Sequence, residues 1–210
     1  MRHPEGTRKA ARVISKLLHP YLGLPVVVAL IAYQASPNPA TWTTWTMAAL
    51  LLAYLPPLLY SYRQARVTAV AQTTGEVSLG SVPQFVREHP NELSVGACLF
   101  GVFSVPILYF LNSPPGIIAT IAGATATMLL TAQVNRIYRS SLHLAFFTSM
   151  TLSLGIILSI PWLFIAPFIV VLGASRYHLG SHTPAQLGVG LLIGLAVTMP
   201  ILNVFGFLAR

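Results

Sequence analysis

Long apolar runs, separated by short polar or proline-rich breaks, dominate the pattern of this 210-residue chain. A helix needs about 20 residues to cross ~30 Å of hydrocarbon, and we compare each run with that length. Seven runs are candidate spans, at about 17–35, 45–62, 93–111, 117–134, 142–160, 162–176 and 184–208. The number falls to six if the first run lies partly in the membrane interface. The pattern therefore predicts an all-α, polytopic transmembrane helix bundle of six to seven spans.

The breaks between the runs predict how the chain is organised. A basic tail over 1–16 precedes two transmembrane helices over 17–62, and we expect Pro56-Pro57 to kink the second of them. The long polar segment 63–92 is expected to lie on the membrane surface as a short helix or loop. Residues 93–210 then form the main transmembrane core. The first run is too long for a signal-peptide core, so we expect it to stay in the mature protein.

The composition excludes several classes of protein. Hydrophobic residues make up 55% of the chain and charged residues only 8%, whereas soluble domains average about 25% charged residues. An ordinary soluble domain, a disordered chain and a secreted disulfide scaffold are therefore excluded. The net charge of +8 comes from sparse basic residues without a basic, aromatic-rich stripe. We therefore expect no nucleic-acid partner, and membrane lipids with anionic headgroups or phosphorylated substrates fit better.

The basic residues are distributed unequally between the two sides that the predicted spans define. The side opposite to the N-terminus carries only Arg210. An excess of Lys and Arg marks the cytoplasmic side of a membrane protein. We therefore expect a multi-pass integral membrane protein whose N-terminal face is cytoplasmic, and that face carries Arg2, Arg8, Lys9, Arg12, Lys16, Arg63, Arg66, Arg87, Arg136, Arg139 and Arg176.

Three clusters of reactive side chains lie on that same side, at 87–90, 139–143 and 175–186. Two predicted spans separate each cluster from the next, so all three return to one membrane face. The planar guanidinium groups of their arginines are permanently charged and able to bind two phosphate oxygens at once. Their histidines are able to supply a nucleophile and a proton donor. Hydroxyls and the amides of helix starts add donors for an oxyanion. This combination is typical of phosphoryl transfer without a metal.

The third cluster carries the most specific motif. Ser175-Arg176 is followed after five residues by His182 and after three more by Gln186. At these residues the chain resembles the type-2 phosphatidic acid phosphatase superfamily, membrane lipid phosphatases related to vanadium haloperoxidases. The motif of that family has Asp where this chain has Gln186. The resemblance covers roughly residues 80–205.

The other two clusters match the family less closely. The stretch 139–143, with Arg139, Ser141 and His143, resembles the Lys-Ile-Ser-Leu-His variant found in short members of the family. The stretch 87–90, beginning with Arg87, resembles their Arg-Glu-x-Arg form but lacks the second arginine. The core over 93–210 is thus expected to be a phosphatase-like transmembrane core with its active site at one membrane face.

The resemblance implies a role for each of these residues. His182 would be the nucleophile that forms a phosphohistidine, and His143 would protonate the leaving alcohol and then activate water. The phosphate would be held by Arg87, Arg139, Arg176 and Ser141. The substrate would be a lipid phosphate monoester or a prenyl diphosphate. The resemblance implies no cofactor and no metal.

Gln186 leaves two functions open. The family's Asp accepts a hydrogen bond from the nucleophilic histidine. The amide oxygen of Gln186 is able to accept the same bond but carries no charge to stabilise an imidazolium. In the serine-protease triad, the corresponding Asp→Asn change costs ~10⁴ in kcat. The chain is therefore either a hydrolase with a neutral orienting residue or a catalytically inactive relative that binds or transports a phosphorylated lipid.

Several of these residues also have simpler interpretations. His143 and Arg87 would suit a membrane interface, and Arg136 would suit a topology signal. His178 lies four residues before His182, a spacing that suits a metal on a helix, but no third ligand lies near it in the sequence. We therefore expect His178 to gate or support the site. Interfacial positions are also expected for His19, His89, Arg63 and Arg66.

Small and hydroxylated residues in the last spans have a packing interpretation. The pattern Gly188-x-Gly190-x-x-x-Gly194 would let helices approach closely. Four threonines of the fourth span would either line a polar cavity or bond back to their own helix, and we favour the second. They are Thr120, Thr125, Thr127 and Thr131.

Overall fold

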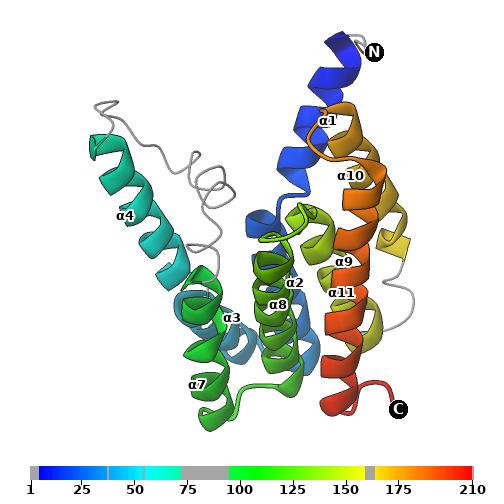
Figure 1. Ribbon diagram of the computed structural model, residues 1–210. Coiled ribbons are helices and arrows are strands. Elements are labelled where there is room, and N and C mark those ends of the chain that lie inside the picture. The colour runs from blue at the N-terminus through cyan, green and yellow to red at the C-terminus, as the bar shows by residue number, and fades with distance from the viewer. Residues whose placement is uncertain (1–4, 37, 54, 72–94, 159–163, 210) are drawn as a thin grey trace.

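A computed structural model of the chain describes residues 5–36, 38–53, 55–71, 95–158 and 164–209 (Figure 1). Within these ranges every extended regular element is a helix, which confirms the predicted all-α class. The elements are α1 (Glu5–Leu17), α2 (Pro20–Ala35), α3 (Pro39–Ala53), α4 (Leu55–Ala71), the π-helix η2 (Cys98–Val102), α7 (Ser104–Phe110), α8 (Pro115–Val134), α9 (Leu142–Ile157), α10 (Pro167–His178) and α11 (Pro184–Val204).

Four helical stretches are long and apolar enough to cross a membrane: Lys9–Ala35, Pro39–Gln64, Pro115–Val134 and Pro184–Val204. Two further apolar helices, Val95–Phe110 and Leu142–Ile157, are shorter. The 16 residues of α9 extend about 24 Å at 1.5 Å per residue, less than the ~30 Å of a hydrocarbon core. The described helices are thus consistent with the predicted helical membrane protein, and four of them are long and apolar enough to cross a bilayer, whereas six to seven spans are not confirmed.

The stretch with the predicted kink at Pro56-Pro57 is covered by α3, which is described to Ala53, and α4, which is described from Leu55. Residue 54 between them lies outside the described residues. α4 leans outward from the remaining helices (Figure 1). Of the predicted interfacial segment 63–92, residues 63–71 belong to α4 and 72–92 lie outside the described residues.

α8 lies at the centre of the bundle, between α2, α9 and α11 (Figure 1). Its apolar side chains are buried on nearly all sides, as expected for a helix that is hydrophobic all round. Ile117 and Ile121 of α8 pack with Ile31 of α2 in the largest core cluster. α8 is therefore the central helix on which the neighbouring helices pack.

Close helix approach explains two of the three glycines in α11. A Cβ on Gly194 would stand 2.6 Å from the carbonyl oxygen of Ala145 in α9, and a Cβ on Gly190 would be equally close to Ser141. Nothing lies within 4 Å of the same position on Gly188. The packing interpretation is therefore confirmed for Gly190 and Gly194 and wrong for Gly188.

The threonines of α8 bond mainly to their own helix. Thr120 donates to the carbonyl oxygen of Gly116 at 2.8 Å, Thr125 to that of Ile121 at 2.8 Å, and Thr131 to that of Thr127 at 2.7 Å. The favoured interpretation is therefore confirmed for these three. A different bond crosses between helices, because Thr198 Oγ1 of α11 donates to Ser149 Oγ of α9 at 2.8 Å.

The connections that carry the predicted chemistry lie at one end of the bundle. α1, the turn between α8 and α9, and the turn between α10 and α11 share this end, while α11 finishes at the opposite end (Figure 1). The second and third clusters therefore lie at the same end, as the even number of crossings predicts. The first cluster, with Arg87 and His89, lies outside the described residues.

Candidate functional site

The end of α10 buries a permanent charge. Arg176 lies in the last turn of α10 and is only 8% exposed, where a cation interacts favourably with the helix dipole. Gly180 then adopts a left-handed conformation with φ of 66°. Two backbone bonds close the helix, from Ser181 N to the Arg176 carbonyl oxygen at 3.0 Å and from Gly180 N to that of Tyr177 at 2.8 Å. This Schellman motif turns the chain back towards the bundle.

The turn then leads through His182 directly into α11. His182 is 8% exposed and precedes Thr183, the N-cap residue of α11. Pro184 follows at the first helical position, which favours it. The nucleophile predicted from the sequence is therefore a buried side chain between two sharply defined helix ends.

Gln186 takes part in a capping box at the start of α11. Its Oε1 accepts a hydrogen bond from Thr183 N at 3.0 Å, and Thr183 Oγ1 accepts one from Gln186 N at 3.3 Å. The predicted partner of this amide oxygen is His182, whereas the bond found is to the backbone of Thr183. The sequence did contain the signal, because Thr followed after two residues by Gln before an apolar run is a capping pattern.

The second cluster forms the start of α9. Ser141 is completely buried and caps α9, with its Oγ accepting from Leu144 N at 3.5 Å. Ser140 is held by Asn135 Oδ1, to which its N and Oγ donate at 2.6 and 2.8 Å. His143 follows in the first turn of α9 and is half-buried. The cap therefore places Ser141 and His143 at the same helix end.

The second and third clusters are joined directly. Ser141 N donates to the carbonyl oxygen of Gln186 at 3.2 Å, and α9 and α11 form the most extensive helix pair among the described elements. The starts of both helices therefore lie side by side at one end of the bundle. Helix starts present backbone N–H donors and the positive end of the helix dipole. This neighbourhood favours an anion.

Two residues that the sequence analysis left out of the site contact it from the N-terminal segment. Arg176 Nη1 donates to Ser15 Oγ of α1 at 3.1 Å. The ring of His19, between α1 and α2, lies edge-to-face on the ring of His143 with centroids 4.7 Å apart. Ser15 belongs to α1 and His19 follows the end of that helix, and no pattern in the sequence around either residue predicts its partner.

The remaining predicted site residues are arranged differently. Arg139 and Arg136 are exposed in the turn before α9. His178 is half-buried at the end of α10, with its ring 5.9 Å from that of Tyr177. Among the residues that the structure describes, no three His, Cys, Asp or Glu side chains gather as metal ligands would. Of the predicted set, the structure joins Ser141 to Gln186 by a hydrogen bond, places His143 in the first turn after Ser141, and buries Arg176 and His182 around the turn between α10 and α11.

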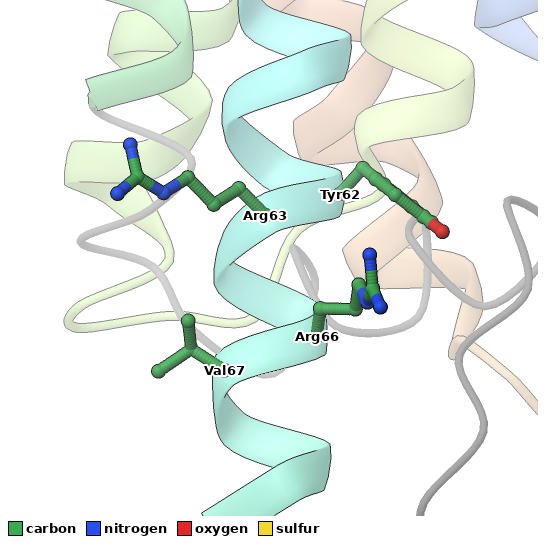
Figure 2. Close-up of a pocket in the computed structure, with 4 residues that line it drawn as sticks. All are labelled: Tyr62, Arg63, Arg66 and Val67. Atoms are coloured by element: carbon green, nitrogen blue, oxygen red, sulfur yellow. The ribbon is translucent and has the colours of Figure 1, made fainter.

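A separate surface cavity of about 370 Å³ borders four described residues of α4: Tyr62, Arg63, Arg66 and Val67. Figure 2 shows that the guanidinium groups of Arg63 and Arg66 project to opposite sides of the helix. They therefore do not converge on one anion. This arrangement is compatible with the predicted contact of each arginine with lipid headgroups.

Comparison of the chain with known protein families, with curated proteins and with solved structures finds no match. The resemblance to the phosphatidic acid phosphatases is therefore carried by its motifs alone and stays a prediction.

Proposed function

We propose that this chain is an integral membrane phosphatase that hydrolyses a lipid phosphate monoester or a prenyl diphosphate. The observation that carries the proposal is the burial of Arg176 and His182 at the bundle end where α9 and α11 begin. Arg176 holds a permanent positive charge at this end of the bundle. Its planar fork fits two phosphate oxygens, and the adjacent helix starts add N–H donors.

The proposed reaction has two steps. His182 attacks phosphorus and the bond to the leaving oxygen breaks, while His143 gives that oxygen a proton. Water then attacks the phosphohistidine, His143 takes the proton of the water, and His182 is released with inorganic phosphate. A positioned acid or base typically contributes ~10²–10⁴-fold. The backbone N–H groups at the start of α9, with Ser141, would stabilise charge on the phosphoryl oxygens.

A lipid substrate would reach the site from the bilayer. The proposal includes six to seven spans and a cytoplasmic site, since the basic residues concentrate on that side. A substrate anchored by its chains would then present its phosphate to the end of the bundle between the helices.

One observation favours a second candidate function. Gln186 Oε1 accepts from Thr183 N, so the side chain that stands in the place of the family's Asp serves the helix cap. A site with buried Arg176 but without an orienting acid would hold a phosphorylated lipid and release it unchanged. The second candidate is therefore a phosphatase-like protein that binds or transports a phosphorylated lipid.

The test measures phosphate release by the purified, full-length protein in detergent with EDTA present. The substrates are phosphatidate, phosphatidylglycerol phosphate and prenyl diphosphates, and the variants are His182→Ala and, as a control, His3→Ala, which replaces a histidine that belongs to none of the three predicted clusters. We expect release by the wild type and by His3→Ala, and loss of at least about 10³-fold in His182→Ala. Acid-labile phosphate trapped on the wild type, but absent from His182→Ala, would identify the intermediate. Full activity of His182→Ala would exclude this mechanism.

Gln186 variants separate the two candidate functions. Gln186→Glu keeps the capping pattern and adds a charge, whereas Gln186→Ala removes the acceptor. For an enzyme with a neutral orienting residue, Gln186→Glu retains or raises kcat and Gln186→Ala lowers it. A binding protein releases no phosphate in any of the three forms but retains phosphatidate on gel filtration, and that retention is lost in Arg176→Ala.

A further inference from the structure

We propose that the N-terminal segment 5–19 is an integral part of the phosphate site, in which Ser15 positions the guanidinium of Arg176 and His19 positions the imidazole of His143. This inference rests on the proposed function and names two positioning residues for it. Three features support it: a buried hydrogen bond, a contact between two rings and the packing of α1 on α10.

The bond between Arg176 Nη1 and Ser15 Oγ joins two buried residues, 8% and 7% exposed, at 3.1 Å. An arginine side chain has several rotatable bonds. A hydrogen bond that holds one nitrogen of its planar guanidinium group orients the whole group. A carboxylate in the place of Ser15 would hold the plane too, but it would neutralise the charge and compete with phosphate. A hydroxyl orients the guanidinium of Arg176 and adds no negative charge of its own.

His19 acts on the second histidine of the site. Its ring meets that of His143 at an interplanar angle of 88°, the edge-to-face arrangement that aromatic pairs prefer. The backbone of His19 is fixed on both sides, because its N donates to the Lys16 carbonyl oxygen at 3.2 Å and its own carbonyl oxygen accepts from Leu22 N at 2.9 Å. Because the backbone of His19 is held in place, its ring stays against the edge of the His143 ring and limits the rotation of that imidazole.

The sequence of α1 explains how these residues reach the site. Among the side chains of α1 that the structure describes, the buried ones are Ala11 and Ser15, one helical turn apart, and α1 packs along α10. Lys9, Arg12 and Lys16 are exposed. Small side chains on the docked face let α1 approach α10 closely enough for a serine hydroxyl to meet the end of Arg176.

A double-mutant cycle tests the role of Ser15. The variants are Ser15→Ala, Arg176→Lys and their combination, with Thr7→Ala as the control that removes an exposed hydroxyl from the same helix. We measure KM and kcat for phosphatidate and, independently of turnover, the Kd of orthovanadate. We expect Ser15→Ala to weaken orthovanadate and raise KM about tenfold, as for a lost hydrogen bond to a charged group. In the Arg176→Lys background, Ser15→Ala should have no further effect, because lysine has no guanidinium group for Ser15 to orient.

A conservative replacement tests His19. His19→Ala should lower kcat about fivefold and leave KM unchanged, in line with the value of an aromatic pair. His19→Phe keeps the edge-to-face contact and should restore most of kcat. Equal losses in both variants, or a loss in KM alone, would overturn the role of His19.

The outcomes distinguish the inference from the proposed function. If the wild type releases phosphate and Ser15→Ala keeps its KM and orthovanadate affinity, the role of Ser15 is wrong and the phosphatase stands. If the wild type releases no phosphate, the proposed phosphatase activity is wrong. The double-mutant cycle measured with the Kd of orthovanadate then decides the role of Ser15. A wild type that does not bind orthovanadate overturns both. If Ser15→Ala does not elute as a single species, Ser15→Cys, which keeps the side-chain volume, replaces it in the cycle.

Discussion

The carbonyl oxygen of Ser141 lies so close to Gly190 that a Cβ on the glycine would stand 2.5 Å from it. This contact sets the distance between the starts of α9 and α11. The same close approach lets Ser141 N donate to the carbonyl oxygen of Gln186 at 3.2 Å, a hydrogen bond that joins the two helices. The candidate site therefore depends on the absence of a side chain at a position outside it.

We predict that Gly190→Ala destabilises the protein by about 1–3 kcal/mol, the usual cost of overpacking a tight contact. The start of α9 would have to move, so phosphatase activity should fall as well. Thermal unfolding in detergent measures the change. Gly188→Ala is the matched control, because nothing lies within 4 Å of its added methyl, and it should be neutral or stabilise by up to about 1 kcal/mol. Equal melting temperatures of the two variants would contradict the packing argument.

We predict that Thr183→Ala destabilises the protein by about 1 kcal/mol, as is typical for the loss of an N-cap. The hydroxyl of Thr183 accepts from Gln186 N, and its removal leaves an N–H of the first turn unsatisfied. Thr183→Ser keeps the hydroxyl and should behave as the wild type. Chemical or thermal unfolding of the three proteins provides the comparison. A wild-type melting temperature for Thr183→Ala would show that the cap contributes nothing.

We predict a measurable coupling between Ser149 and Thr198, whose hydroxyl groups bond across α9 and α11 at 2.8 Å. A cycle of Ser149→Ala and Thr198→Val should give a coupling energy of about 0.5–1.5 kcal/mol, the range for hydrogen bonds between membrane helices. Thr120→Val provides the comparison, since Thr120 bonds to the Gly116 carbonyl oxygen of its own helix. Thr120→Val should show no coupling to Ser149→Ala. Strict additivity of the first pair would exclude the cross-helix bond.

We predict that the exposed basic face of α1 strengthens binding to anionic lipid. Neutralising Lys9, Arg12 and Lys16 to Gln should weaken the retention of phosphatidate by about fivefold for each charge, from roughly 1 kcal/mol per basic residue near a membrane surface. The effect should decrease with added salt, because exposed charges are screened. Gel filtration with labelled phosphatidate in two salt concentrations measures it. A salt-independent loss would point to misfolding of α1 instead.

The fold class followed from the sequence because long apolar runs have few alternatives in a membrane. The same argument placed the second and third clusters at one end, since it needs only the number of crossings. The ends of the helices followed from it less well. In the run at 142–160, α9 ends at Ile157, and the run at 45–62 begins inside α3, which starts at Pro39. Apolar composition alone does not specify where a helix ends.

The candidate site was predicted less completely than the fold. Arg176 and His182 follow from a local motif, and the structure finds both buried. Gln186 was interpreted through the family's Asp, while the nearer explanation was its spacing from Thr183. Ser15 could not be assigned, because its partner is chosen by the docking of two helices, and no pattern within a short window encodes that choice.

The bond between Ser15 and Arg176 also has a consequence for the order in which the molecule is made. It joins residues 161 positions apart. A chain is synthesised from its N-terminus, so α1 emerges from the ribosome well before α10. Contacts of such long range form only after the intervening chain is in place. The hydrogen bond that holds the Arg176 guanidinium therefore forms late, when the segment around Ser15 meets the newly made α10.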